Sequence, residues 1–176
     1  MFNHKTGLFN HYTIPNDKTI VSFHVVNAHE ILLGTSEFLY RLTILNNKTK
    51  LEKIPYKGLT NPTSFQRIYT IQPYKGIFLI GTKGGVLQYS PKTGVFKEIV
   101  DQHHKSIGIC RTIYQTPENT YFSSGLGGIF SLVKGVDTLV LSQNPYNEAI
   151  LKASRYLITC FYQETKNTLW MGTAGS

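Results

Sequence analysis

Several basic and aromatic side chains in this sequence are of the types that bind anions and flat ring faces. Three arginines and one tyrosine stand near the starts of separate apolar runs, and a Thr-Lys pair follows one of those runs. A guanidinium presents five donors in a planar fork that matches carboxylate or sulfate, and a tyrosine ring offers apolar area with a polar tip. The candidate ligand-binding residues are Arg67, Tyr69, Thr82, Lys83, Arg111 and Arg155.

Catalytic, metal and cofactor chemistry finds little support in the residue types. The ten carboxylates are dispersed, with no close pair for acid–base work. His103 and His104 stand beside Asp101, but adjacent side chains on a strand point to opposite faces, and in a loop such residues are usually solvated. Gly-rich residues 125–128 are not followed by the Lys-Ser/Thr of a phosphate loop. We therefore predict no catalytic residue, no metal and no cofactor.

The composition is that of a globular chain with a basic surface. Hydrophobic residues make up 41% of the 176 residues, charged residues 16%, and the formal net charge is +8. The lysines are scattered and form no run of nucleic-acid-binding length, so no nucleic acid is expected as a partner. Cys110 and Cys160 both lie in apolar runs and are predicted to be buried free thiols. The chain shows no apolar leader and no run near the roughly 20 residues of a membrane helix.

The elements that must position these residues belong to an internal repeat. The string Ile-Leu-Leu-Gly-Thr at residues 31–35 recurs as Phe-Leu-Ile-Gly-Thr at 78–82 and as Leu-Trp-Met-Gly-Thr at 169–173, with a degenerate copy at 121–125. Aligned on positions 34, 81, 124 and 172, the copies lie 47, 43 and 48 residues apart. Periods of roughly 40–50 residues are typical of propeller blades or of paired-helix repeats.

The local pattern within one copy favours the blade. Residues 67–99 contain four short β-rich runs, which are separated by Gly/Pro turns at 73–76, 83–85 and 90–94. No stretch there is long enough and free of breakers to form an ordinary helix. Four strands in each repeat indicate a β-propeller blade.

The second run of each blade is apolar on both faces, so both faces must be covered. Leu79 and the residues aligned with it are expected to wedge between neighbouring blades. The aligned residues are Leu32, Phe122 and Trp170. Gly34, Gly81 and Gly172 are expected to permit close backbone approach.

The predicted fold class is all-β: a partial propeller with about four blades' worth of four-stranded antiparallel sheets and a ring that is not closed. The expected division is 1–14 for the end of a preceding blade, blades at 21–55, 67–99 and 110–141, and the first half of another at 156–176. Propeller rings typically have 4–8 blades, so three blades and two partial ones would close only under strain. Open repeat ends expose apolar surface, and the isolated chain is expected to self-associate.

Residues 79–96 resemble the two-component regulator propeller repeat. The shared features are an apolar-apolar-Gly-Thr core, a tight Gly turn and a Tyr-x-Pro-x-Thr-Gly hairpin; residues 169–173 and 110–114 resemble other parts of the same repeat. The kelch-type repeat is a poorer match because a long loop follows its Gly pair, and the WD-type repeat lacks its Gly-His and Trp-Asp pairs here. The resemblance covers nearly the whole chain, most weakly at 21–55.

The resemblance implies a fragment of the periplasmic sensor of a bacterial hybrid two-component system, often responsive to glycan fragments. Its implied partners are an oligosaccharide, the remaining blades and signalling domains of a parent chain, and a second copy in a parent homodimer. Any kinase activity would lie outside these residues. The alternatives are a propeller lyase or glycosidase, a protein-interaction scaffold, or a truncated gene product without an independent role.

Chain direction places the candidate residues on one rim of the propeller. Each inner strand starts at the rim where the second strand turns into the third, which would gather the arginines with Thr82 and Lys83. There the guanidinium groups could bind carboxylates or sulfates of an acidic glycan, while Tyr69 stacks on a sugar face. The competing interpretation is that these are ordinary loop charges.

Overall fold

A computed structural model describes residues 2–3, 7–9, 19–46, 48–133, 141–143, 157–165 and 168–174. Apart from one short 3-10 helix, η2 (Pro62–Phe65), its regular elements are all strands. The strands are β1 (Phe2–Asn3), β2 (Leu8–Phe9), β3 (Ile20–Asn27), β4 (Glu30–Thr35), β5 (Leu39–Leu45), β6 (Lys48–Ile54), β7 (Ile68–Tyr74), β8 (Ile77–Thr82), β9 (Gly85–Ser90), β10 (Val95–Ile99), β11 (Ile113–Gln115), β12 (Thr120–Ser123), β13 (Ile129–Leu132), β14 (Leu141–Gln143), β15 (Leu157–Thr165) and β16 (Thr168–Ala174).

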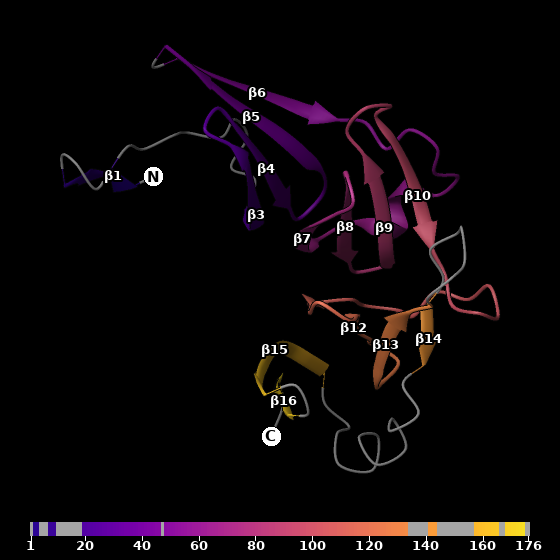
Figure 1. Ribbon diagram of the computed structural model, residues 1–176. Helices are drawn as coiled ribbons and strands as arrows, with labels where there is room; N and C mark the ends of the chain where they lie inside the picture. The colour runs from indigo at the N-terminus through magenta and orange to yellow at the C-terminus, as the bar shows by residue number, and fades with distance from the viewer. Residues whose placement is uncertain are drawn as a thin grey trace.

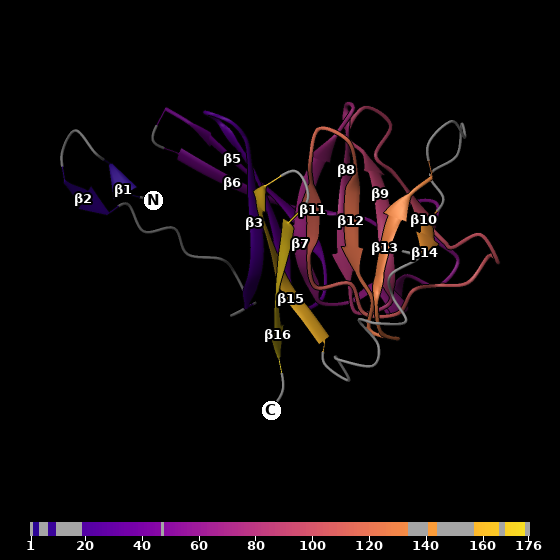
Figure 2. The ribbon, with the colours of Figure 1, turned by 60° about the horizontal axis from the view of Figure 1, so that its bottom comes forward.

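The strands form five antiparallel sheets, each built from consecutive strands. Three sheets have four strands, in the orders β3-β4-β5-β6, β7-β8-β9-β10 and β11-β12-β13-β14, and two are hairpins, β1-β2 and β15-β16. In Figure 1 the sheets from β3 to β16 follow one another around a common centre, with the first strands β3, β7 and β15 on the inner side. The first strand of the third sheet, β11, is the edge strand that contacts β7 and β8. Figure 2 shows β7–β14 from the side, where the strands of the second and third sheets run alongside each other. The predicted partial, unclosed propeller is confirmed.

The core lies between the sheets rather than within one layer. One cluster fills the space between the first and second sheets, and a second cluster fills the space between the second and third. Leu32 and Ile80 belong to the first cluster, and Leu79 and Phe122 to the second, all of them nearly inaccessible to solvent. The residues of β8 from Ile77 to Ile80 point alternately into these two clusters, which explains their unbroken run of hydrophobic side chains.

A threonine side chain closes the turn after the second strand and helps to join successive sheets. The Thr82 hydroxyl donates to the Gly85 carbonyl over 2.9 Å and accepts from the Gly84 N–H, and Thr35 makes the corresponding bonds in the first sheet. The Thr82 carbonyl also accepts from the Cys110 N–H at 2.9 Å. Buried polar groups of these turns are therefore paired, as burial requires.

Gly34 and Gly81 allow neighbouring sheets to approach closely, as predicted. A Cβ atom at Gly34 would lie 2.5 Å from Cγ2 of Ile68, and one at Gly81 would lie 2.5 Å from the Cys110 carbonyl oxygen. Both contacts are far inside van der Waals distance. The inter-sheet spacing therefore depends on the missing side chains at these positions.

Gly34→Ala is expected to lower the free energy of unfolding by about 1–3 kcal/mol, because the added methyl group forces the first two sheets apart. Urea denaturation followed by far-ultraviolet circular dichroism measures this change. The double variant Gly34→Ala/Ile68→Ala provides a check, since removal of the Ile68 branches should make the alanine at position 34 less costly than it is alone. An unchanged midpoint for Gly34→Ala would show that the sheets are not in this contact.

The structure corrects the alignment of the third repeat by one residue. Ser123 pairs with Ile129 as Gly81 pairs with Val86, so Ser123 and not Ser124 is the counterpart of Gly81. Ser124 takes the role of Thr82, because its hydroxyl accepts from the N–H two residues ahead. The turn between β12 and β13 is one residue longer than the turn between β8 and β9, and this extra residue misled the sequence alignment.

Two predictions about burial in the β15-β16 sheet are wrong. Trp170 is 60% exposed, and its indole N–H donates to Glu164 at 2.9 Å instead of packing in a core. Cys160 is also exposed, whereas Cys110 is buried as predicted. Both errors have the same cause: an apolar strand is buried only where another sheet covers it, and in the described structure no further sheet packs on this face of β15-β16.

Candidate functional site

The structure brings together three of the residues predicted to bind ligand. The guanidinium carbons of Arg67 and Arg111 lie 5.7 Å and 5.4 Å from the centre of the Tyr69 ring. Both distances are within the range of cation–π attraction. Arg67 is exposed and the other two are half-buried. We call these three residues the arginine rim.

One hydrogen bond between sheets and one within the third repeat hold the arginine rim in place. The Arg67 N–H donates to the Ser36 carbonyl of the first sheet at 3.0 Å, and the Arg111 N–H donates to the Ser123 hydroxyl at 3.0 Å. Arg67 has φ +60, a left-handed conformation that costs a residue with a side chain about 1–3 kcal/mol. The buried Ile68 that follows anchors this conformation. Strain of this kind is found at sites where the direction of a side chain matters.

The other predicted site residues differ in their availability. Lys83 is exposed and its N–H bonds the Arg67 carbonyl at 3.2 Å, so its backbone lies next to the arginine rim. Thr82 is fully buried and its hydroxyl is committed to the turn, which leaves it a structural role. Arg155 lies outside the described residues. The accessible residues of the candidate site are therefore Arg67, Tyr69, Arg111 and Lys83.

The charge and hydrogen-bonding state of the arginine rim suit an anion. The described structure shows no carboxylate paired with Arg67, Arg111 or Lys83. Two guanidinium charges therefore stand near one tyrosine ring, and the backbone of the exposed Lys83 lies beside Arg67. Nε of Arg111 is buried and has no hydrogen-bond partner among the described residues. An unsatisfied buried donor costs about 1–3 kcal/mol. Arg111 as a whole is half-buried, so a carboxylate or sulfate would bind the accessible part of its guanidinium and would reach Nε only if the side chain moved.

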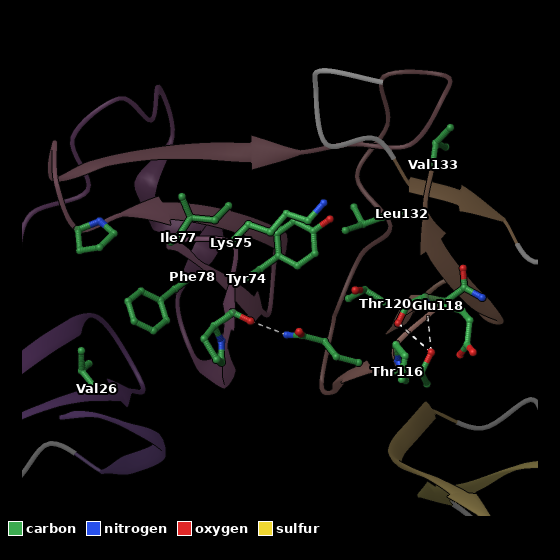
Figure 3. A pocket seen from close by; sticks show the side chains of 16 residues that line it. Val26, Tyr74, Lys75, Ile77, Phe78, Thr116, Glu118, Thr120, Leu132 and Val133 are labelled. Carbon is green, nitrogen blue, oxygen red and sulfur yellow. Dashed lines mark hydrogen bonds between the residues drawn. The ribbon is translucent and has the colours of Figure 1, made fainter. Parts of the chain in front are cut away.

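A larger hollow opens on the opposite rim, between the second and third sheets (Figure 3). Its volume is about 920 Å³, and it lies between the β7-β8 turn and the β11-β12 turn. Figure 3 shows Tyr74, Lys75 and Ile77 on one side and Thr116, Glu118 and Thr120 on the other. The Gln115 side-chain amide donates to the Pro73 carbonyl across the floor at 2.7 Å. We call this hollow the inter-sheet groove.

The inter-sheet groove was missed by the sequence analysis. Its walls are two hairpin turns that lie more than forty residues apart, so only the packing of adjacent sheets creates it. The repeat did contain a usable signal, because turns between the first and second strands of successive blades must lie on one rim. In the β7-β8 turn, Lys75 and Gly76 both have positive φ, which fits the tight two-residue hairpins that twisted strands prefer.

The arginine rim and the inter-sheet groove differ in what they offer a ligand. The rim carries a local excess of positive charge without a deep hollow. The groove combines apolar walls with both a lysine and a glutamate, Lys75 and Glu118. Lys75 Nζ lies 5.3 Å from the centre of the Tyr74 ring, so part of its charge is directed at the protein itself. An anionic ligand therefore finds stronger attraction at the arginine rim.

The described residues show neither a metal-binding cluster nor a membrane-spanning helix. Among the described residues, no group of three or more His, Cys, Asp or Glu side chains is placed to hold a metal ion. The Asp101 carboxylate accepts from the N–H groups of His103 and Lys105, both at 2.8 Å. Those hydrogen bonds lower its pKa, Lys105 contributing most. No helix in the described part of the chain has the length and apolarity to cross a membrane.

Comparison with known proteins identifies the fold but no family. No protein-family model matches the chain, and no curated protein is significantly similar to it. Among solved structures, the extracellular domain of a hybrid two-component system from B. thetaiotaomicron aligns with a TM-score of 0.64 and 18% identity, over 98% of this chain and 22% of that one. A second such domain from the same organism aligns with a TM-score of 0.58 and 19% identity, over 83% and 19%.

A designed protein shares the fold as well. The computationally designed Ika4 protein aligns with a TM-score of 0.58 and 14% identity, over 90% of this chain and 88% of that one. The present chain therefore spans about a fifth of the length of the two natural extracellular domains, but nearly the length of the designed protein. At these identities the comparisons show the fold.

Proposed function

We propose that this chain is part of the extracytoplasmic ligand-sensing propeller of a hybrid two-component signalling protein. The observation that carries the proposal is the arginine rim: two guanidinium groups lie 5.7 Å and 5.4 Å from one tyrosine ring, and no carboxylate among the described residues pairs with either of them. The similarity of the fold to extracellular domains of hybrid two-component systems supports a sensing role and an extracytoplasmic location.

The ligand class that fits the arginine rim is an acidic glycan fragment. A uronate carboxylate or a sulfate can accept two parallel hydrogen bonds from an arginine fork, and the apolar face of a sugar ring can stack on Tyr69. In this proposal the segment binds its ligand and leaves it chemically unchanged. The binding free energy would serve to favour one arrangement of the parent protein over another.

The test is titration calorimetry of the chain with three probes: an oligogalacturonate, a sulfated heparin-type oligosaccharide and a neutral oligosaccharide of similar length. Binding of one acidic probe and not of the neutral probe is expected, with affinity that falls as salt is added because exposed charges are screened. Chromatography of the incubated probe should show no cleavage. Equal affinity for the neutral probe, or turnover of any probe, would contradict the proposal.

Substitution of either arginine should weaken the binding of the acidic probe. Arg67→Ala or Arg111→Ala removes a charge-assisted hydrogen bond worth about 1.5–3 kcal/mol, which corresponds to roughly a tenfold to hundredfold loss of affinity. Lys92→Ala is the matched control, because it also removes one positive charge but lies in the β9-β10 turn on the opposite rim. A second arm uses Tyr74→Ala in the inter-sheet groove. Loss of binding only in that arm would move the site to the groove.

A further inference from the structure

The β1-β2 hairpin has the geometry of the outer hairpin of a four-stranded sheet. Four residues, 4–7, separate β1 from β2, as residues 91–94 separate β9 from β10, and both sequences end in Lys-Thr-Gly. Gly7 and Gly94 share φ +68. The corresponding pairs are Phe2↔Phe9 with Tyr89↔Phe96, and Asn3↔Leu8 with Ser90↔Val95. The hairpin therefore matches third and fourth strands.

The β15-β16 hairpin matches the other half of a four-stranded sheet, namely its first and second strands. Cys160 pairs with Gly172 as Thr70 pairs with Gly81 in the β7-β8 pair. In the second sheet, β9 then pairs with the other edge of β8. Among the described residues no strand pairs with that edge of β16. An open edge of this kind presents unpaired backbone groups that favour addition of another strand.

Apolar faces beside these hairpins are also uncovered. Phe23 of β3 occupies the same position in its sheet as Ile71 does in the second sheet, because each pairs with the residue just before the glycine of the second strand. Ile71 is buried, but Phe23 is 66% exposed. Trp170 is likewise the exposed counterpart of the buried Leu79. Phe23 lies on the face of the first sheet that points away from the second. Trp170 lies on the face of the β15-β16 sheet that corresponds to the Leu79 face of the second sheet.

We propose that a second copy of this chain covers these surfaces: the β1-β2 hairpin of one copy pairs with β16 of the other and completes its sheet. The repeat register then places Phe2 opposite Leu169, as Tyr89 lies opposite Phe78 in the second sheet. The completed sheet packs its Trp170 face on the Phe23 face of the copy that supplied the hairpin. This inference concerns the 176-residue chain by itself, where no other blades of a longer propeller cover these surfaces.

The internal sheet interfaces serve as the template for this contact. Between the described four-stranded sheets, each covered apolar face packs on the neighbouring sheet, which is built from the next copy of the repeat. Leu32 of the first sheet, for example, shares a buried cluster with Ile71 and Ile80 of the second. The connection from β2 to β3, residues 10–19, is similar in length to the connections that lead from one sheet to the next at 55–67 and 100–112. A hairpin at β1-β2 therefore belongs in the sheet directly before β3.

A second copy is chosen as the partner because a single chain leaves two hairpins unpaired with each other and two apolar faces exposed. Within one chain β1-β2 and β15-β16 remain separate sheets, and the Phe23 and Trp170 faces remain exposed. Two copies related by a twofold axis satisfy both surfaces at once, because each copy gives a hairpin and receives one. The result is a closed ring of eight sheets, which lies within the usual range for propellers.

The first test is the mass and fluorescence of the 176-residue chain. Light scattering after size-exclusion chromatography should give a dimer. Trp170 is the only tryptophan, so its emission should shift to longer wavelength on dilution as the dimer dissociates. Phe23→Glu should raise the dimer dissociation constant at least tenfold. Leu126→Glu is the matched control, since it makes the same kind of change at an exposed residue in the β12-β13 turn and should leave the constant unchanged.

The second test fixes the partner strand. In a Cys160→Ser background, the substitutions Phe2→Cys and Leu169→Cys should allow a disulfide to form between copies on mild oxidation, which is seen as a dimer band without reductant. A monomeric chain with an internal cross-link would overturn the proposal in favour of closure within one chain. Oligomers of mixed size without the cross-link would overturn it as well. The cross-link does not require that any interface variant fold.

Discussion

Leu79→Ala is expected to lower the free energy of unfolding by about 2–5 kcal/mol. Leu79 is fully buried in the cluster between the second and third sheets, where it packs among residues that include Val86, Ile113 and Phe122. Truncation removes apolar contacts from both sheets and leaves a cavity that rigid strands fill only partly. A domain of this kind is stable by about 5–15 kcal/mol, so one such change removes a large share of the total.

The matched control for this prediction is Leu126→Ala. Leu126 is 76% exposed, so the same chemical change should alter stability by no more than about 0.5 kcal/mol. Urea denaturation followed by far-ultraviolet circular dichroism, at one fixed protein concentration, gives both values. If the two variants lose similar stability, the second and third sheets do not pack through Leu79, and the stacked-sheet architecture is wrong.

The strands and their grouping could be predicted from the sequence because their signals are local. Gly/Pro turns interrupt short apolar runs, and the repeat multiplies each weak signal several times. The third repeat shows the limit of this method. Ser123 and Ser124 differ by one position in the alignment, and only the pairing of Ser123 with Ile129 reveals which of them replaces the glycine. Sequence similarity could not locate the extra turn residue.

Burial was predictable only where the covering sheet exists. Trp170 and Leu79 occupy equivalent positions, yet one is exposed and the other buried, because the difference lies in what packs on them and not in their own strands. The same reasoning applies to the site. The approach of Arg67 and Arg111 to Tyr69 could be expected from the direction of the strands. The role of Thr82 could not, because its hydroxyl is used in a hydrogen bond to the Gly85 carbonyl that the residue types alone do not predict.

Cys110 and Cys160 should differ at least a thousandfold in their rate of reaction with a disulfide reagent such as DTNB in the folded protein. Burial raises the pKa of the Cys110 thiol to about 12, and its Sγ–H is directed at the Thr112 carbonyl. The thiolate is the reactive species, so at pH 8 only about one Cys110 in ten thousand would be reactive even if the reagent could reach it. Cys160 is exposed. One thiol should therefore react at once and the second only in urea.

The raised pKa of Cys110 also predicts a loss of stability in alkali. A thiol whose pKa is higher in the folded than in the unfolded chain stabilises the fold fully below the unfolded value, near 9, and loses that contribution as pH rises toward about 12. Urea midpoints measured from pH 8 to pH 11 should fall more steeply for the natural chain than for Cys110→Ala, which lacks this group. Tyr56 and Tyr89 also have pKa values raised by burial, but they titrate alike in both proteins and cancel in the difference. Parallel curves, or rapid reaction of both thiols at pH 8, would mean that Cys110 is not enclosed between the second and third sheets.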